Sequence, residues 1–152
     1  MKRYVLFALA LMLGLGLTFG GCATTPEKAP QAAPEAMTAK ELVAEAKKNI
    51  CEISVSEAKA RLDKGGYLFL DCREPKEFKM GHVPGAMNIP RGLLEFAIDK
   101  KVPDKNADIV VYCKVGGRGC LSACTLCRMG YKKVANMAGG WKAWEKAGYP
   151  VE

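Results

Sequence analysis

Residues 109–118 (IVVYCKVGGR) combine a candidate nucleophile with a backbone suited to holding an anion. Three β-branched residues open the stretch and predict a buried strand, which stops at Cys113. The glycine pair that follows permits a tight turn, and a helix is expected from Arg118 onward. This arrangement aims backbone N–H groups and the positive end of a helix at one point, which lowers the pKa of a cysteine there. Cys113 is therefore predicted to be a thiolate nucleophile, and the alternative is a small buried hydrophobic residue.

The loop after Cys113 supplies the rest of the predicted site. Its backbone N–H groups would stabilise an anionic sulfur, so the candidate substrate-binding residues are Lys114, Val115, Gly116, Gly117, Arg118 and Gly119. The cationic side chains of Lys114 and Arg118 suit an anionic sulfur donor. Arg118 has an alternative role, because its side chain could instead turn inward to Asp71 or Glu77 and brace the loop.

A second group of residues is expected to support the nucleophile from a neighbouring strand. Residues 67–70 are a nearly continuous apolar run, which predicts a strand covered on both faces and ending at Asp71. Asp71 and Cys113 then share the carboxyl edge of a parallel sheet. His82 lies in a loop rich in Gly and Pro, where a structural hydrogen bond is favoured over a role as general base. The predicted supporting residues are Asp71, Arg73, Glu77 and His82.

Strand and helix patterns alternate along the chain with short connections between them. Two capping boxes, at residues 38–41 and 54–57, predict helix starts. Further strand patterns lie at residues 109–111 and 134–137, each followed by a helix pattern. This order predicts an α/β sandwich, in which helices flank a mainly parallel sheet.

The N-terminus has the composition of a secretory signal. Residues 1–21 contain two basic residues, an apolar run and small residues before a cysteine. The small residues before Cys22 resemble a bacterial lipobox, although Phe19 departs from that pattern, so Cys22 is the predicted lipidation site. An ordinary signal peptide and an uncleaved anchor are the alternatives.

The organisation expected downstream is a tether, a helix and one domain. Residues 22–37 are rich in Ala and Pro and are predicted to be a flexible tether. A short N-terminal helix is expected at 38–50 and the globular domain at 51–152. We therefore expect a domain that is lipid-anchored to a membrane on the periplasmic side of the cell envelope.

The remaining cysteines give no metal or cofactor prediction. Cys124 and Cys127 have the spacing of a redox or metal pair, but no second pair or neighbouring histidine completes a site. A thiol redox protein that uses this pair remains a rival function. Two pairing hypotheses are Cys51 with Cys72, and Cys120 as a resolving thiol for Cys113.

The net charge of +7 comes from scattered basic residues with few aromatic residues among them. Nucleic acid is therefore not an expected partner.

Three ordered motifs resemble those of the rhodanese-like domain family. They are residues 71–78 with 81–90, the loop 112–118, and the closing segments 130–131 and 139–150. The resemblance covers residues 51–152 and implies a three-layer sandwich with a five-stranded, mainly parallel sheet. It also implies sulfur transfer through a persulfide on Cys113. The family commonly has Ser-Ala where this chain has Gly119 and Cys120, which bears on a hydroxyl contact to the bound sulfur.

The resemblance and the loop together predict a sulfurtransferase. Cys113 would take the sulfane sulfur of a donor such as thiosulfate and pass it to cyanide, a thiol or a protein cysteine. A persulfide or sulfide carrier or sensor module without turnover is the alternative. Cys113 and Arg118 enclose four residues, whereas related phosphatases enclose five, so the shorter loop favours a sulfur atom over a phosphoryl group.

Overall fold

The computed structural model describes residues 36–152. The predicted signal at 1–21, the lipidation site Cys22 and most of the predicted tether lie outside the described residues. Within residues 36–152, no helix is long and apolar enough to cross a membrane.

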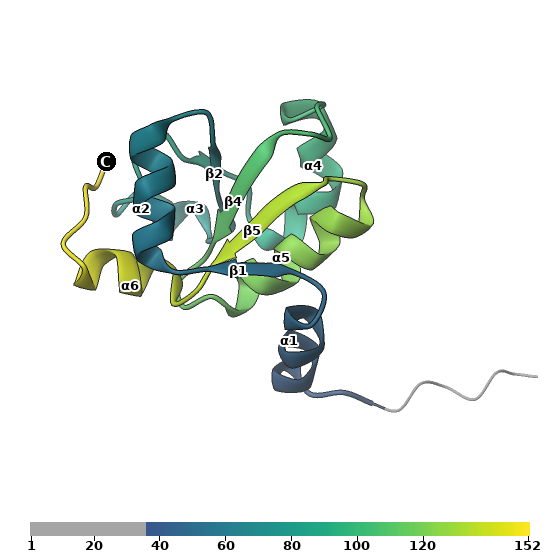
Figure 1. Cartoon of the computed structure of the whole chain (residues 1–152). Coiled ribbons are helices and arrows are strands. Elements are labelled where there is room, and N and C mark those ends of the chain that lie inside the picture. Colours follow the sequence, from purple (N-terminus) through teal and green to yellow (C-terminus); the bar gives the residue numbers. More distant parts are fainter. Residues whose placement is uncertain (1–35) are drawn as a thin grey trace, which may run out of the picture. The chain divides into compact units, whose positions relative to one another are not determined.

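Five strands and seven helical segments make up the described part of the chain (Figure 1). The strands are β1 (Cys51–Ile53), β2 (Leu68–Asp71), β3 (Met87–Asn88), β4 (Asp108–Tyr112) and β5 (Lys133–Met137). The helices are α1 (Ala39–Lys47), α2 (Val55–Lys64), α3 (Pro75–Phe78), α4 (Leu94–Lys101), α5 (Gly117–Arg128) and α6 (Gly140–Lys146), with a 3₁₀ turn η1 (Arg91–Leu93) before α4.

All strand pairs are parallel, and the strand order is β1-β5-β4-β2-β3. The predicted fold class, an α/β fold with a five-stranded parallel sheet flanked by helices, is confirmed. In the β2–β4 register Asp71 pairs with Tyr112, so these two strands end at the same level. The residues that follow them, Cys72 and Cys113, therefore lie side by side at the carboxyl edge of the sheet.

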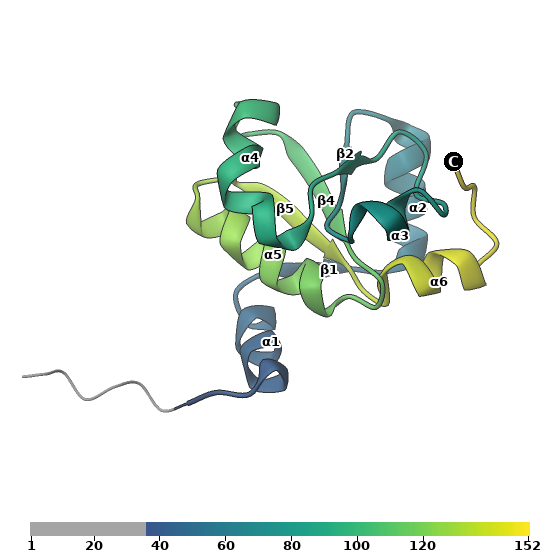
Figure 2. The same ribbon diagram turned by 180° about the vertical axis from the view of Figure 1, so that it is seen from behind.

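Helices cover the sheet on both faces, as Figures 1 and 2 show from opposite sides. Alternate residues of β4 divide between the two cores because side chains of a strand alternate in direction. Ile109 and Val111 pack with α4 and α5, whereas Val110 and Tyr112 pack with residues of α2 and α6. The central strand is thus buried on both faces, in agreement with its continuous apolar sequence.

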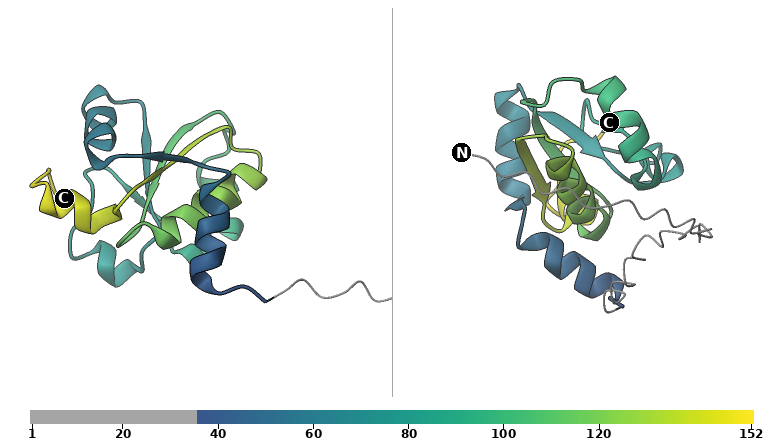
Figure 3. Two further views of the ribbon diagram at one scale, coloured as in Figure 1. Left: turned by 60° about the horizontal axis from the view of Figure 1, so that its bottom comes forward. Right: turned by 90° about the vertical axis from the view of Figure 1, so that its right-hand side faces the viewer.

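Both predicted capping boxes are present. Thr38 and Glu41 cap α1 reciprocally, and Ser54 and Glu57 do the same for α2. Helix α1 packs beside α5 (Figure 3), with Ala46 as its buried residue.

The hypothesis of a Cys51–Cys72 disulfide is wrong. Cys51 opens β1 and Cys72 follows β2, and the sheet places β5 and β4 between these strands. All six cysteines of the described residues are free.

Candidate active site

Cys113 lies directly after the central strand β4, at the base of the turn that leads into α5. The Gly116 N–H donates a hydrogen bond to Cys113 Sγ at 3.2 Å. Gly116 adopts φ +100°, a left-handed conformation that glycine takes without strain, and α5 begins at the next residue. The turn therefore folds its amides inward around the sulfur, although Cys113 is only 1% exposed.

The surroundings of the sulfur lower the pKa of Cys113 to about 5. The largest cause is a hydrogen bond from the Cys72 thiol; burial opposes it, and the N–H groups of Gly119, Val115 and Gly116 add to it. A thiol with this pKa is ionised at neutral pH, which makes the sulfur nucleophilic.

Cys72 is the neighbour that sequence reasoning did not assign to Cys113. It is fully buried, and its Sγ donates to the Tyr112 carbonyl oxygen at 3.0 Å. A hydrogen bond to the Cys113 sulfur, burial and the negative charge of Cys113 raise the pKa of Cys72, so it stays a thiol and acts as a donor. The sequence did contain a signal for this contact, because Cys72 and Cys113 each directly follow an apolar strand.

The Arg118 side chain turns to Glu77, which decides between its two predicted roles. Arg118 Nη1 and Nη2 lie 2.9 and 3.1 Å from the two Glu77 carboxylate oxygens. This bidentate pair lowers the pKa of Glu77 and ties the first turn of α5 to α3. The guanidinium thus braces the loop from outside, while the Arg118 backbone remains part of it.

Asp71 and Arg73 form a buried ion pair behind the loop. Arg73 Nη2 lies 2.7 Å from Asp71 Oδ2 and also donates to the Gly81 carbonyl oxygen at 2.7 Å. The guanidinium carbon of Arg73 lies 4.6 Å from the centroid of the Trp141 ring. This pair therefore links the end of β2 to the loop at Gly81 and to α6.

His82 has structural contacts. Its Nδ1 lies 3.1 Å from the Phe78 carbonyl oxygen, and its ring stacks on Phe78 with centroids 3.6 Å apart. Its backbone exchanges hydrogen bonds with Glu152 at 2.9 and 3.0 Å. These contacts hold the C-terminal segment to the loop after α3.

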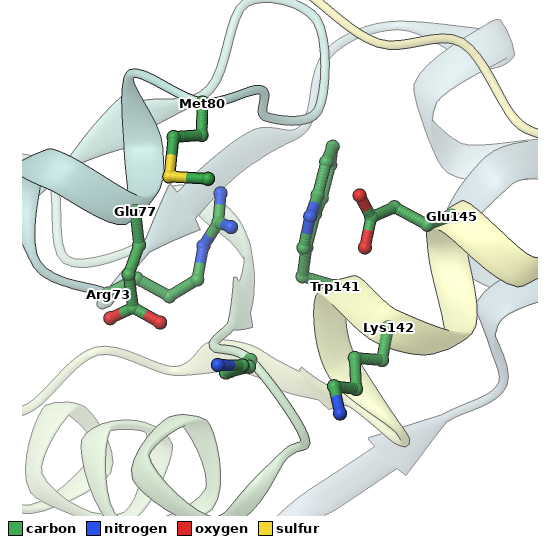
Figure 4. A pocket seen from close by; sticks show the side chains of 7 residues that line it. Arg73, Glu77, Met80, Trp141, Lys142 and Glu145 are labelled. Carbon is green, nitrogen blue, oxygen red and sulfur yellow. The ribbon is translucent and has the colours of Figure 1, made fainter.

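A cavity of about 210 Å³ opens beside the Cys113 loop. Figure 4 shows Met80, Glu77 and Arg73 on one side of it and Trp141, Lys142 and Glu145 on the other; Lys114 completes the lining. Arg73 and Glu77 are already paired with Asp71 and Arg118. Among residues 36–152, no ion pair occupies Lys114, Lys142 or Glu145, so the unpaired charges of the lining are two ammonium groups and one carboxylate.

Two glycines allow α6 and α5 to approach the Cys113 backbone. A Cβ at Gly140 would collide with the Cys113 carbonyl oxygen, and the Trp141 N–H donates to that same oxygen at 2.7 Å. A Cβ at Gly119 would lie 2.5 Å from Asn136 Oδ1, which accounts for glycine where the family commonly has serine. The contributions of Lys142 and Trp141 were not predicted, and the Gly139–Gly140 pair was the signal for this close approach.

The other predicted residues stand as follows. Lys114 and Val115 are exposed at the tip of the loop, and Val115 is 61% exposed. Gly117 and Gly119 lie in the first turn of α5. Cys120 does not face Cys113; its Sγ contacts the Val43 carbonyl oxygen of α1 at 3.6 Å, so the hypothesis that Cys120 resolves Cys113 is not supported by its position.

Comparison with known proteins identifies the class. The family model of the rhodanese-like domain matches residues 54–147, and the chain belongs to this family. A sulfurtransferase from Allochromatium vinosum is 34% identical over 84 residues, which are 55% of this chain and 77% of that protein. The thiosulfate sulfurtransferase PspE of Escherichia coli is 40% identical over 74 residues, 49% of this chain and 70% of PspE. Family and relatives support sulfur transfer as the general activity.

One solved structure with the same fold has a different functional description. A protein of unknown function from Rhodopseudomonas palustris, described as a possible tyrosine phosphatase, has a TM-score of 0.69 and 33% identity. The match covers 82% of this chain and all of that chain.

Proposed function

We propose that this protein is a rhodanese-type sulfurtransferase in which Cys113 carries the transferred sulfur. The Cys113 thiolate attacks the sulfane sulfur of thiosulfate, a new S–S bond forms, the S–S bond of thiosulfate breaks and sulfite leaves. A nucleophile such as cyanide or a thiolate then attacks the outer sulfur, and the Cys113 thiolate is regenerated. No cofactor takes part in either step.

The observation that carries this proposal is the set of hydrogen-bond donors around one sulfur. The Gly116 N–H is fixed before substrate arrives, so it stabilises negative charge without reorganisation, and the Cys72 thiol beside it has the ionised sulfur as an alternative acceptor to the Tyr112 carbonyl oxygen. The persulfide places its outer sulfur about 2 Å beyond Sγ.

Lys114 and Lys142 favour an anionic donor. Both side chains line the cavity beside the loop, and the Lys142 N–H donates to the Lys114 carbonyl oxygen at 3.0 Å, which joins α6 to the loop. These two ammonium groups outnumber the one unpaired carboxylate of the lining, Glu145, so the opening attracts a dianion such as thiosulfate more strongly than a neutral thiol.

The test is thiocyanate formation from thiosulfate and cyanide. We expect turnover in the wild-type chain and none in Cys113→Ser. A Cys113 persulfide that forms without any turnover would contradict the enzyme and favour the alternative, a persulfide carrier or sensor module. Turnover that survives Cys113→Ser would remove Cys113 from the mechanism.

Phosphatase activity is the rival that the Rhodopseudomonas structure raises. The four-residue spacing between Cys113 and Arg118 gives a narrow loop, and the Arg118 guanidinium is held by Glu77 outside it. We therefore expect no hydrolysis of an aryl phosphate under conditions that give thiocyanate.

The proposed location is the periplasmic side of the cell envelope, with Cys22 lipidated as the anchor. The support is the sequence of residues 1–22. In a bacterial host, the wild-type chain should incorporate labelled palmitate, and Cys22→Ser should incorporate none. Equal labelling of the two chains, or labelling of neither, would exclude lipidation of Cys22.

A further inference from the structure

We propose that Cys72 is a resolving thiol for the Cys113 persulfide, and that its attack on Cys113 Sγ releases hydrosulfide and leaves a Cys72–Cys113 disulfide. The inference rests on the proposed function, because the persulfide is its substrate. It adds a second outcome to the site: sulfide release when no acceptor takes the outer sulfur.

The sheet places the two cysteines within reach of each other. They are the first residues beyond the paired positions Asp71 and Tyr112 of β2 and β4, and the Cys72 N–H continues the ladder to the Tyr112 carbonyl oxygen at 2.9 Å. Adjacent strands are about 4.8 Å apart, inside the range of Cα separations that disulfides span.

Both side chains also point to the same face of the sheet. Cys72 and Cys113 belong to one buried cluster together with Leu70 and Val111, the residues two positions earlier on each strand. Because side chains alternate in direction along a strand, the register of β2 and β4 places both cysteines on this face whatever their rotamers.

The Cys72 proton has two acceptors. One is the Tyr112 carbonyl oxygen at 3.0 Å, and the other is the Cys113 sulfur, whose charge makes it the stronger acceptor when ionised. The Cys72 thiol is therefore next to the sulfur that it would attack, and it carries the proton that the leaving group needs.

The reaction balances without an external oxidant. The Cys72 Sγ–Cys113 Sγ bond forms, the bond from Cys113 Sγ to the outer sulfur breaks, and the Cys72 proton leaves with that sulfur as hydrosulfide. The outer sulfur is reduced to the level of sulfide, the Cys72 sulfur is oxidised, and Cys113 Sγ keeps the oxidation state that it had in the persulfide. An external thiol returns both cysteines to the reduced state by exchange.

Resolution should be slower than transfer to an abundant acceptor. Cys72 stays protonated at neutral pH, and a thiol attacks far more slowly than a thiolate. The disulfide also shields Cys113 from irreversible oxidation when sulfur acceptors are scarce.

The experiment follows the intact mass of the full chain after anaerobic loading with thiosulfate and removal of excess donor, with no acceptor present. The loaded protein should first gain one sulfur, about 32 Da. It should then lose this sulfur, and a species about 2 Da lighter than the reduced protein should appear. One sulfide should be released per disulfide, and peptide mapping should place the bridge between Cys72 and Cys113.

Two variants control the result. Cys72→Ser keeps a hydrogen-bond donor beside Cys113 and should hold the gained sulfur at least about tenfold longer than the wild-type chain. Cys124→Ser removes a thiol from α5 outside the site and should behave like the wild type.

Three outcomes overturn the inference. A persulfide that lasts equally long in the wild-type chain and in Cys72→Ser contradicts it while leaving the proposed function intact. A disulfide mapped to another cysteine in the wild-type chain contradicts it even if Cys72→Ser fails to fold. If neither chain gains sulfur, the proposed function fails, and this inference fails with it.

Discussion

At the scale of single residues, the charge on Cys113 depends on a few donors of known identity. Three backbone N–H groups and one thiol stabilise the anion, and burial opposes them. The thiol comes from Cys72, which is the donor that a substitution can remove while the turn backbone stays in place.

Replacing Cys72 with Val should raise the pKa of Cys113. Valine fills the buried site but donates no hydrogen bond, so the midpoint should move up from about 5 by about one pH unit. The ultraviolet absorbance of the thiolate, followed against pH, measures this midpoint without a reagent that must enter the site. Cys72→Ser is the control, because it retains a donor. Identical midpoints for all three proteins would mean that the backbone alone holds the charge.

Replacing Glu77 with Gln should slow sulfur transfer and lower stability only slightly. The Arg118–Glu77 pair is partly exposed, so its loss should cost no more than about 1 kcal/mol of unfolding free energy. The first turn of α5 would lose its contact with α3. A loss of about 1 kcal/mol in transition-state stabilisation by the loop makes sulfur transfer roughly fivefold slower. Steady-state thiocyanate formation and urea unfolding measure the two effects.

The matched control is Glu95→Gln. It breaks the similarly exposed Arg91–Glu95 pair, which lies outside the loop. Equal rates for the two variants would show that Arg118 needs no partner to keep the loop in place.

Much of this residue-scale chemistry could be predicted from the sequence. Cys113 and the loop amides follow from where an apolar run stops and glycines begin, and Asp71 follows from the end of the neighbouring apolar run. The direction of Arg118 could not be predicted, since an anionic donor and the carboxylates of Asp71 and Glu77 were all plausible partners. Cys72 as a donor required the strand register, which local patterns do not specify.

At the scale of secondary-structure elements, the loop is held between β4, α5 and the start of α6. Gly140 is the closest of these contacts, because its Cα faces the Cys113 carbonyl oxygen and Gly116 N. The cavity has the same origin: it forms between residues 73–80 and 141–145, which are distant in sequence. Sequence patterns predicted both segments, but their contact depends on the packing of α6 against the sheet.

Replacing Gly140 with Ala should disrupt the loop, and Gly148→Ala is its matched control. Both glycines have positive φ, +57° and +67°, so each substitution should cost about 1 kcal/mol of backbone strain. Only at Gly140 would the new Cβ strike the Cys113 carbonyl oxygen, and we expect at least about 2 kcal/mol of additional destabilisation. Urea unfolding measures the difference. Equal losses for the two variants would mean that α6 can shift away from the loop.

At the scale of the whole described unit, α1 is an addition to a domain that has its own cores. Neither buried cluster contains an α1 residue, yet α1 packs on α5 and its Val43 carbonyl oxygen contacts Cys120. The N-terminal helix was predicted from its capping box. Its position against α5 was not, because most of its apolar residues are exposed.

Undocking α1 should expose Cys120 with little loss of global stability. Ala46→Arg places a charge at the buried contact of α1, whereas Ala44→Arg places it on the exposed side of the same helix. Alkylation of Cys120, located by peptide mapping, should accelerate at least about tenfold in Ala46→Arg and stay unchanged in Ala44→Arg. Slow alkylation in both variants would mean that Cys120 is shielded by α5 and the sheet alone.

The central claim is that one ionised sulfur, Cys113, accepts a second sulfur. Its most direct test is the intact mass of the chain immediately after exposure to thiosulfate, followed by location of the modification. We predict a gain of one sulfur atom, about 32 Da, on Cys113 in the wild-type chain and in Cys124→Ser, with none in Cys113→Ser. An unchanged mass, or a gain located on a different cysteine, would contradict the account.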